Sequence, residues 1–328
     1  MQPVKIQRYF EKYLVYLIGI SMALGIFFGI YFPARAPALK PWVPFTLFLM
    51  LYPMMIGIQI EQITKAVKNS RLIIWSIVLN FFVSPLIGFL VARLLLGRLP
   101  DFAVALILLA ATPCAGMVAG WTGMAKGNVA LSLVIVSLSL VLSIITIPFT
   151  MLLLAGAMVK VDVAALFQGT LLVILIPIIL GDITRRLIIH CSGEPGFMRV
   201  RPLLPPVSML GMFAIIFISM ALGAQKILTQ WQSIFIILVS IVIFYFLQMV
   251  ISIRLSKKFE FNPADEIALV YSVIGKNVSL AVGLAAQFFS PLTVAMLAIN
   301  PLVQAPAMAW FLRWSRKTLL KKMPAENS

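Results

Sequence analysis

The sequence predicts an all-α polytopic membrane protein with ten transmembrane helices, and three observations lead to this fold class. Hydrophobic residues make up 62% of the chain and charged residues only 11%, whereas a soluble domain has about 25% charged residues. Ten apolar segments each approach the ~20 residues that a helix needs to cross a ~30 Å hydrocarbon core. Their apolar residues are continuous rather than alternating, which favours helices over barrel strands, because a helix satisfies its backbone polar groups internally.

The first five segments carry two features that bear on the fold. The first segment lacks a small-residue cleavage site behind its apolar core, so we expect a retained helix and a mature chain that begins near Met1. The fourth contains Pro113, which removes a backbone donor and crowds the preceding turn, so that the helix either kinks or breaks there. These five segments span residues 13–32, 42–60, 72–96, 102–125 and 130–157.

The second five segments begin after a short connection near Val161. The ninth has a clear start, since Asn262 is a natural N-cap and Pro263 suits the first helical position. The longest connection, at about 185–205, is polar and rich in proline, and we expect it to be a cytoplasmic loop rather than a domain. These five segments span residues 164–184, 206–224, 231–253, 264–289 and 291–312.

The basic residues predict the orientation. With an even number of spans both termini share one side, and 19 of the 26 lysines and arginines fall on that side, including a basic tail at 313–328. By the positive-inside rule, both termini are then cytoplasmic, in the plasma (inner) membrane. The net charge of +16 therefore needs no nucleic-acid partner. Six basic residues fall on the opposite side: Arg35, Lys40, Arg93, Arg98, Lys160 and Lys226.

The numbers of segments predict an internal repeat. An odd number of helices in each half puts the two halves in opposite orientations, which is the arrangement of an inverted-repeat transporter. Repeat one would cover about 13–157 and repeat two about 164–312, within a single transmembrane domain. The fourth and ninth segments then correspond, and both are interrupted. Paired interruptions in matching segments indicate a binding site near the middle of the membrane.

Lys276 belongs to neither side of the membrane. It lies thirteen residues past Pro263, which at ~1.5 Å per residue places it roughly 20 Å into the ninth segment. An ionised lysine at that depth costs at least ~2.5 kcal/mol, and no acidic residue is placed at similar depth. Two roles remain open: a tether that bonds helix-end carbonyls or a carboxylate, and a functional group that attracts an anion or exchanges a proton.

Cys114 follows Pro113 directly, and it is either a small packing residue or a soft sulfur ligand. A lone cysteine is a weak metal signal, because metal sites need several ligands and the single histidine lies in a loop. We therefore expect no metal site, no cofactor and no disulfide to Cys191. No nucleophile is paired with a base, so the sequence does not predict an enzyme. The polar residues singled out near Cys114 and Lys276 are Thr112, Pro113, Ser272, Asn277 and Ser279.

Other polar residues of the segments, among them Asn80, Asn300 and Gln304, are interpreted as interhelical hydrogen bonds worth ~0.6 kcal/mol each. This interpretation leaves them outside the candidate site.

Two stretches, "LMLYPMMIGIQIEQI" at 49–63 and "ATPCAGM" at 111–117, resemble the arsenite efflux permeases of the bile acid/arsenite transporter superfamily. A third, at 125–156, is similar to the bile acid:sodium symporter branch. The resemblance covers nearly the whole chain, and the Pro-Cys pair of the fourth segment is its most specific arsenite-branch feature. It implies ten helices in a core and a panel domain, crossing broken helices four and nine, and alternating access.

The resemblance also assigns residues. Sodium-coupled members have a carboxylate and, four residues later, a glutamine in the ninth helix, where this chain has Ser272 and Lys276. Arsenite permeases have a glutamate after an Asn-Asn-Phe run, and the match "KNVS" puts Ser279 at that position. Cys114 falls on the cysteine that arsenite permeases use for trivalent metalloid. Lys276 would then act as a built-in cation where other members bind sodium.

These expectations converge on a secondary active transporter in the lipid bilayer that exports a metalloid oxyacid or small anion. Proton exchange through Lys276 is favoured over sodium coupling. One alternative is an organic-anion carrier of the bile-acid-symporter kind, in which Lys276 pairs with a substrate carboxylate. Another is a membrane sensor or scaffold that transports nothing.

Overall fold

The computed structural model describes residues 3–57, 70–156 and 162–319. All regular secondary structure in these ranges is helical, and their one β-like feature is an isolated bridge between Cys114 and Lys276. The predicted all-α class is therefore confirmed. The end of the second predicted segment at 58–60, Lys160, and residues 320–328 of the predicted tail lie outside the described residues.

The first half of the chain contains more helices than predicted segments, because several segments are divided. The pieces η3 and η4 are π-helical turns, and η1 is a 3₁₀ helix. The elements are α1 (Pro3–Tyr31), η1 (Ala36–Trp42), α2 (Val43–Ile56), α4 (Ser70–Val78), η3 (Leu79–Val83), α5 (Ser84–Leu95), α6 (Pro100–Ala111), α7 (Met117–Met124), α8 (Val129–Thr150) and η4 (Met151–Ala155).

The second half differs from prediction at the expected loop. The connection predicted as a loop at about 185–205 is mostly helical, because α9 extends to Val200 with a kink at Gly193 that separates two helical stretches. Gly193, at φ 67°, turns the chain there without the steric cost that a side chain would bring. The elements are α9 (Val163–Val200), η5 (Arg201–Leu203), α10 (Leu204–Thr229), η6 (Trp231–Ser233), α11 (Ile234–Lys258), α12 (Pro263–Ile274), α13 (Val278–Phe288), α14 (Pro291–Ile299) and α15 (Pro301–Thr318).

In the described residues, seven helical segments are long and apolar enough to cross a membrane. One of them, Ala164–Thr229, contains both α9 and α10. The others are Tyr13–Tyr31, Ala36–Ile56, Arg71–Leu95, Val129–Ala155, Trp231–Lys258 and Pro291–Thr318. Two further apolar helices, α6 and α13, are shorter.

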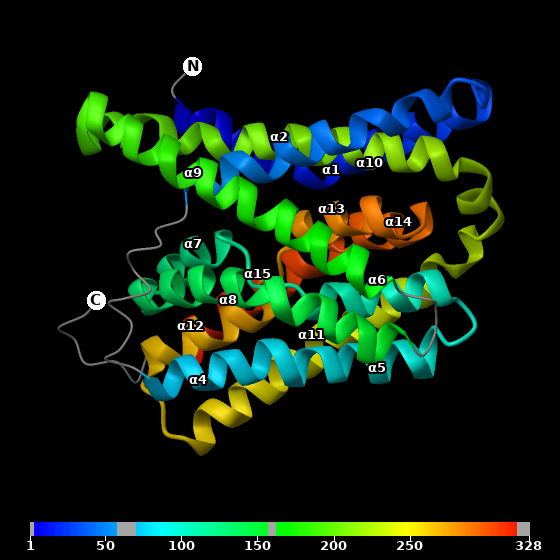
Figure 1. Cartoon of the computed structure of the whole chain (residues 1–328). Helices are drawn as coiled ribbons and strands as arrows, with labels where there is room; N and C mark the ends of the chain where they lie inside the picture. Colours follow the sequence, from blue (N-terminus) through cyan, green and yellow to red (C-terminus); the bar gives the residue numbers. More distant parts are fainter. Residues whose placement is uncertain (1–2, 58–69, 157–161, 320–328) are drawn as a thin grey trace. The chain divides into compact units, whose positions relative to one another are not determined.

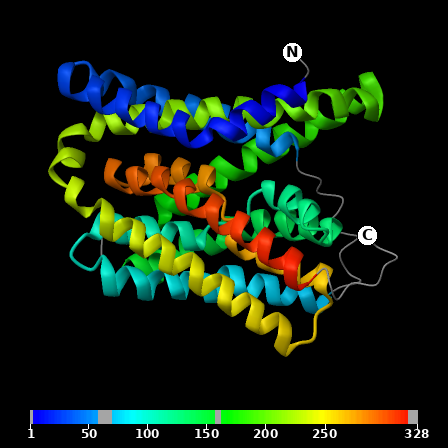
Figure 2. The same ribbon diagram turned by 180° about the vertical axis from the view of Figure 1, so that it is seen from behind.

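The chain forms two compact units. The first unit contains residues 1–58, 162–235 and 279–299. Within it α10 packs along α1 and α2, and α2 also packs on α9 (Figures 1 and 2). The α10 and α2 backbones approach so closely that a Cβ at Gly211 would lie 2.5 Å from the Met50 nitrogen. The nearby Ser208 hydroxyl donates to the Met50 carbonyl, so small residues set this contact.

The second unit contains residues 59–161, 236–278 and 300–328, and it holds the candidate site. Helices α6 and α12 form its interior: the side chains from Phe102 to Ala111 and from Asp265 to Ile274 are all buried. A helix that is apolar on every side is stable only when other helices surround it. Here α5 and α8 pack on α6, while α4, α7, α8 and α15 pack on α12.

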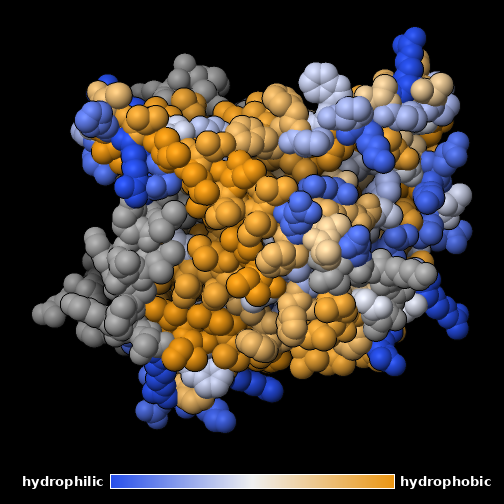
Figure 3. All heavy atoms as spheres, in the orientation of Figure 1, coloured by the Kyte–Doolittle hydropathy of each residue, from blue (hydrophilic) through white to orange (hydrophobic). Residues whose placement is uncertain are grey.

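Both units expose large apolar side chains, and apolar residues cover much of the face seen in Figure 3. Leu94, Phe82 and Ile145 of the second unit are 80%, 69% and 66% exposed, and Tyr16 of the first is 70% exposed. Water would solvate such surfaces poorly, whereas lipid tails match them.

Candidate functional site

The stretch between α6 and α7 is extended because of its proline. The residue before a proline is pushed away from helical backbone angles, and Thr112 accordingly has φ −69° and ψ 150°. Helix α6 therefore ends at Ala111, inside the second unit rather than at its surface. The last carbonyls of α6 have no partner within their own helix, so other groups must satisfy them.

Helix α12, in the second half of the chain, ends next to the stretch between α6 and α7. Asn262 caps it as predicted, since its side-chain oxygen accepts from the Asp265 backbone nitrogen at 2.9 Å. The helix ends at Ile274, and three non-helical residues, Gly275, Lys276 and Asn277, follow before α13 begins. A Cβ on Gly275 would lie 2.3 Å from Val118 Cγ2 and 2.7 Å from the Tyr271 carbonyl oxygen, so the packing here admits only glycine.

The two extended stretches pair with each other. The Ala115 nitrogen donates to the Gly275 carbonyl at 2.8 Å, and the Asn277 nitrogen donates to the Pro113 carbonyl at 2.9 Å. These antiparallel bonds flank Cys114 and Lys276, which lie directly opposite each other. Opposed residues of such a bridge project from the same face. The pairing explains how irregular backbone is tolerated in a buried position, because each stretch supplies the partners that the other lacks.

A substitution pair tests the close approach at this crossing. Gly275→Ala is expected to lower the melting temperature of the detergent-purified protein clearly, because the added Cβ overlaps both the Val118 side chain and the Tyr271 carbonyl oxygen. Gly116→Ala, in the opposing stretch, is the matched control, since a Cβ there meets nothing within 4 Å. Equal melting temperatures for the two variants would contradict the close approach at Gly275.

The Lys276 ammonium lies in a cage of uncharged oxygen atoms. It donates to the carbonyls of Ala110 at 3.0 Å and Thr112 at 3.2 Å, and to Asn80 through Oδ1 at 3.1 Å and the carbonyl at 3.5 Å. The side chain is 0% exposed. Two of these acceptors end α6, where the helix dipole places partial negative charge, so a cation is favoured there.

The local sequence explains why the Asn80 carbonyl is not used within its own helix and can accept from Lys276. Asn80 lies in the π-helical turn η3, where the Ser84 nitrogen donates to the Leu79 carbonyl instead of to Asn80. The next nitrogen along belongs to Pro85, which has no hydrogen to give. Such π-turns often occur at functional sites because they release backbone groups in this way.

A second layer of hydrogen bonds surrounds the cage. Ser84 Oγ donates to the Ala110 carbonyl at 2.9 Å and accepts from Gln248 Nε2 at 2.7 Å. On the other side, Gln304 Nε2 donates to the carbonyls of Lys276 at 2.9 Å and Ile274 at 3.2 Å, which satisfies the end of α12. All of these groups are buried, and they fix the positions of the oxygens around the ammonium.

The Cys114 thiol is buried against α8. Its Sγ lies 3.2 Å from Ser139 Oγ, and the same hydroxyl lies 3.0 Å from the Val136 carbonyl. A serine hydroxyl has one hydrogen. When that hydrogen goes to Val136, the thiol is the donor in its contact with Ser139. Ser139 therefore holds Cys114 in place and keeps a lone pair to spare.

The structure brings some of the predicted site residues together and leaves others apart. Thr112, Pro113 and the Asn277 backbone belong to the paired stretches with Cys114 and Lys276. The Ser272 hydroxyl donates to the Leu269 carbonyl of its own helix at 2.7 Å. Ser279 belongs to the other unit, where its hydroxyl contacts Met212 Sδ at 3.7 Å.

Sequence reasoning missed Asn80, Ser139 and the role of Gln304. A proline five residues after Asn80 was the available signal for a released carbonyl. No corresponding signal marks Ser139, because its importance depends on a contact between distant parts of the chain. In the described ranges, no group of three or more His, Cys, Asp or Glu side chains is placed to hold a metal ion.

Comparisons with known proteins identify a family and similar chains. The family model described as "Sodium Bile acid symporter family" matches residues 44–231. The chain is 27% identical to the arsenical-resistance protein Acr3 of Alkaliphilus metalliredigens, over 94% of this chain and 93% of that protein. It is 21% identical to Acr3 of Corynebacterium glutamicum, over 94% and 88%. It is also 24% identical to YocS of Bacillus subtilis, named an uncharacterized sodium-dependent transporter, over 94% of each.

Proposed function

Because this chain belongs to the Sodium Bile acid symporter family, and is thus a multi-pass membrane transporter, we propose that it exports a metalloid oxyacid such as arsenite, or a similar small anion. The observation that carries the proposal is the Cys114 thiol, which lies on the extended stretch directly opposite Lys276. A soft sulfur suits a trivalent metalloid. The similarity to two proteins named for arsenical resistance supports the same substrate.

The coupling ion is a proton rather than sodium. The Lys276 ammonium already occupies a cage of four oxygens of the kind that would otherwise hold a small cation. An external sodium ion would have to displace this charge or lie beside it, and like charges at that separation repel strongly in a buried environment. Loss of a proton from Lys276 would weaken all of these contacts at once. This would link proton movement to the pairing of the two extended stretches around Cys114 and Lys276.

In the proposed architecture, the chain crosses the membrane ten times in two inverted repeats, and the fourth and ninth spans are broken helices. Counting α9 and α10 separately raises the seven long apolar segments to eight. The pairs α6–α7 and α12–α13 supply the other two. The two compact units support a division into core and panel domains that move during alternating access. The basic residues support cytoplasmic termini in the plasma membrane.

An organic-anion carrier is the main rival. In that function Lys276 would pair with a substrate carboxylate, but its donors are already engaged by Ala110, Thr112 and Asn80. Lys276→Gln separates the two functions in transport assays. Metalloid transport that persists but loses its proton dependence favours the exporter, whereas loss of carboxylate binding favours the rival.

Arsenite flux into proteoliposomes is the direct test. The purified protein is expected to move arsenite under an imposed proton gradient and to gain nothing from a sodium gradient. Liposomes without protein give the background. Flux driven only by sodium would contradict the assigned coupling. Absence of flux under both gradients would contradict the substrate, and a panel of carboxylates would then test the organic-anion carrier. A sensor or scaffold would transport neither class.

A further inference from the structure

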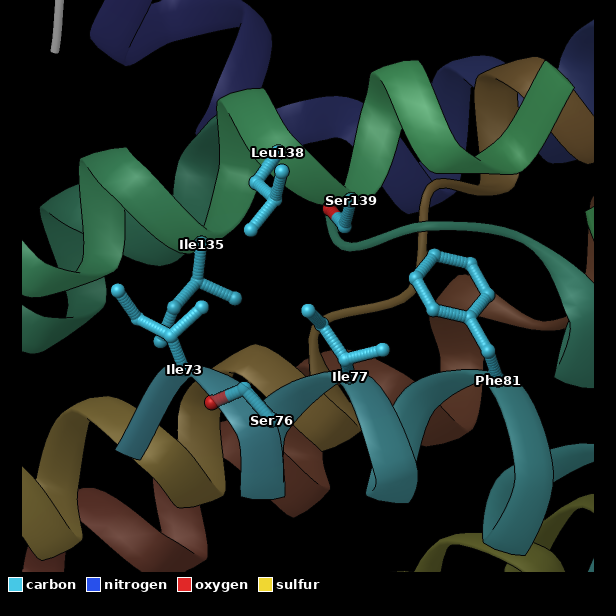
Figure 4. Close-up of a pocket in the computed structure, with 7 residues that line it drawn as sticks. All are labelled: Ile73, Ser76, Ile77, Phe81, Ile135, Leu138 and Ser139. Carbon is cyan, nitrogen blue, oxygen red and sulfur yellow. The ribbon is translucent and has the colours of Figure 1, made fainter. Parts of the chain in front are cut away.

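A narrow recess lies between α4–η3 and α8 in the second unit (Figure 4). Its walls are mainly apolar, and two serines interrupt them. In Figure 4 Ser76 comes from α4 and Ser139 comes from α8, on opposite sides of the recess. The lining residues are Ile73, Ser76, Ile77, Phe81, Ile135, Leu138 and Ser139.

The two serines have complementary hydrogen-bonding capacity. Ser76 is 1% exposed, and its hydroxyl has no hydrogen-bond partner in the part of the chain that the structure describes. It therefore has one hydrogen to donate and lone pairs to accept. Ser139 gives its hydrogen to Val136 and keeps a lone pair. A buried hydroxyl without a partner is costly, so a group that fills this role is expected.

Hydrogen bonds connect each wall of the recess to the candidate site. Ser139 contacts the Cys114 thiol at 3.2 Å. The Ser76 carbonyl accepts from Asn80 Nδ2 at 3.0 Å, and Asn80 in turn accepts from Lys276. The recess therefore adjoins both Cys114 and the ammonium cage, while none of its lining residues is charged.

We infer that this recess is a hydroxyl-recognition subsite, in which Ser76 and Ser139 bind one hydroxyl group of an uncharged, hydroxylated solute at Cys114. The Ser76 hydroxyl donates to the solute oxygen, and the solute hydroxyl donates to the spare lone pair of Ser139. The residues that line the recess carry no charge to offset that of an ionised oxyanion, so an uncharged hydroxyl is favoured there. The inference rests on the proposed function and narrows it, since arsenite at neutral pH is the uncharged arsenous acid.

The test measures how well a solute protects Cys114 from methyl methanethiosulfonate. The purified full chain carries Cys191→Ser, which leaves Cys114 as its only thiol. Two probes are used: arsenous acid, which is thiophilic, and boric acid, an uncharged trihydroxy acid. Ser76→Ala is expected to raise the half-protecting concentration about three- to tenfold, the value of one lost hydrogen bond. Ser76→Thr, which keeps the hydroxyl, is expected to restore protection.

Ser143→Ala is the matched control. Its hydroxyl donates to the Leu140 carbonyl on the same helix, as that of Ser139 does to Val136, and Ser143 does not line the recess. Half-protecting concentrations unaffected by Ser76→Ala would overturn the subsite, and so would absence of protection by both probes. Ser76-dependent protection by boric acid alone would support the subsite and overturn the metalloid substrate. Melting temperatures confirm that each variant is folded.

Discussion

Lys276→Met is expected to destabilise the protein severely, with most of the expressed chain lost from the monodisperse fraction in detergent. Methionine keeps much of the volume of the side chain but donates no hydrogen bond. The carbonyls of Ala110 and Thr112 and the side chain of Asn80 would then each lose a buried donor. The Ala110 carbonyl keeps its hydrogen bond from Ser84, which leaves the Thr112 carbonyl and Asn80 Oδ1 without this donor. At ~1–3 kcal/mol for each unsatisfied group, the loss amounts to a large part of a typical ~5–15 kcal/mol of stability.

The control for this variant is Lys226→Met. Lys226 is an exposed lysine near the end of α10, so its loss should leave the melting temperature nearly unchanged. Fluorescence-detected size-exclusion chromatography after heating compares both variants with the parent chain. A Lys276→Met variant as heat-resistant as Lys226→Met would show that the ammonium does not hold the crossing together.

Chemical rescue distinguishes the lost charge from general damage. Lys276→Ala leaves a cavity that propylammonium fills with the missing atoms, including the charged group. Added propylammonium is therefore expected to raise the melting temperature of Lys276→Ala and not that of the parent chain. Propanol, which has similar size and no charge, should be much less effective. Equal effects of the two solutes would indicate that the cage requires volume rather than a cation.

The sequence predicted which segments form the site better than it predicted which residues contact one another there. Composition and continuous apolar runs were sufficient for the all-α class, and Pro113 and Asn262 marked the end of one buried helix and the start of the other. Both depend on local backbone chemistry, which a sequence displays directly. Lys276 lies deep in its segment, and this depth indicated that a hydrogen-bonding or charged partner must offset the free-energy cost of burying the lysine.

The partners themselves could not be found in this way. Asn80 and Gln304 resembled ordinary interhelical polar residues, because only the fold brings them to Lys276, 196 and 28 residues away in sequence. The site role of Ser279 stays a prediction, because Ser279 belongs to the other compact unit. The division between the two compact units falls between Val278 and Ser279, inside α13, and no local pattern marks it.

Cys114→Ser is expected to reduce arsenite flux to the level of liposomes without protein while leaving the fold intact. Binding of arsenous acid by the thiol forms a sulfur–arsenic bond and breaks one arsenic–oxygen bond, and the thiol proton leaves with the hydroxide as water. A serine oxygen is a hard donor and gives no comparable bond. The serine side chain is only moderately smaller than that of cysteine and can still bond to Ser139, so the melting temperature should change little.

Cys191→Ser is the control, because Cys191 is exposed and lies far along the chain from the paired stretches. It should keep both flux and arsenite resistance in cells that lack their own exporter. Cys114→Ser with undiminished flux would remove sulfur from the mechanism, and transport would then depend on hydroxyl recognition by Ser76 and Ser139. Loss of flux in Cys114→Ser at an unchanged melting temperature, with normal flux in Cys191→Ser, would assign the selection of the metalloid to the Cys114 thiol.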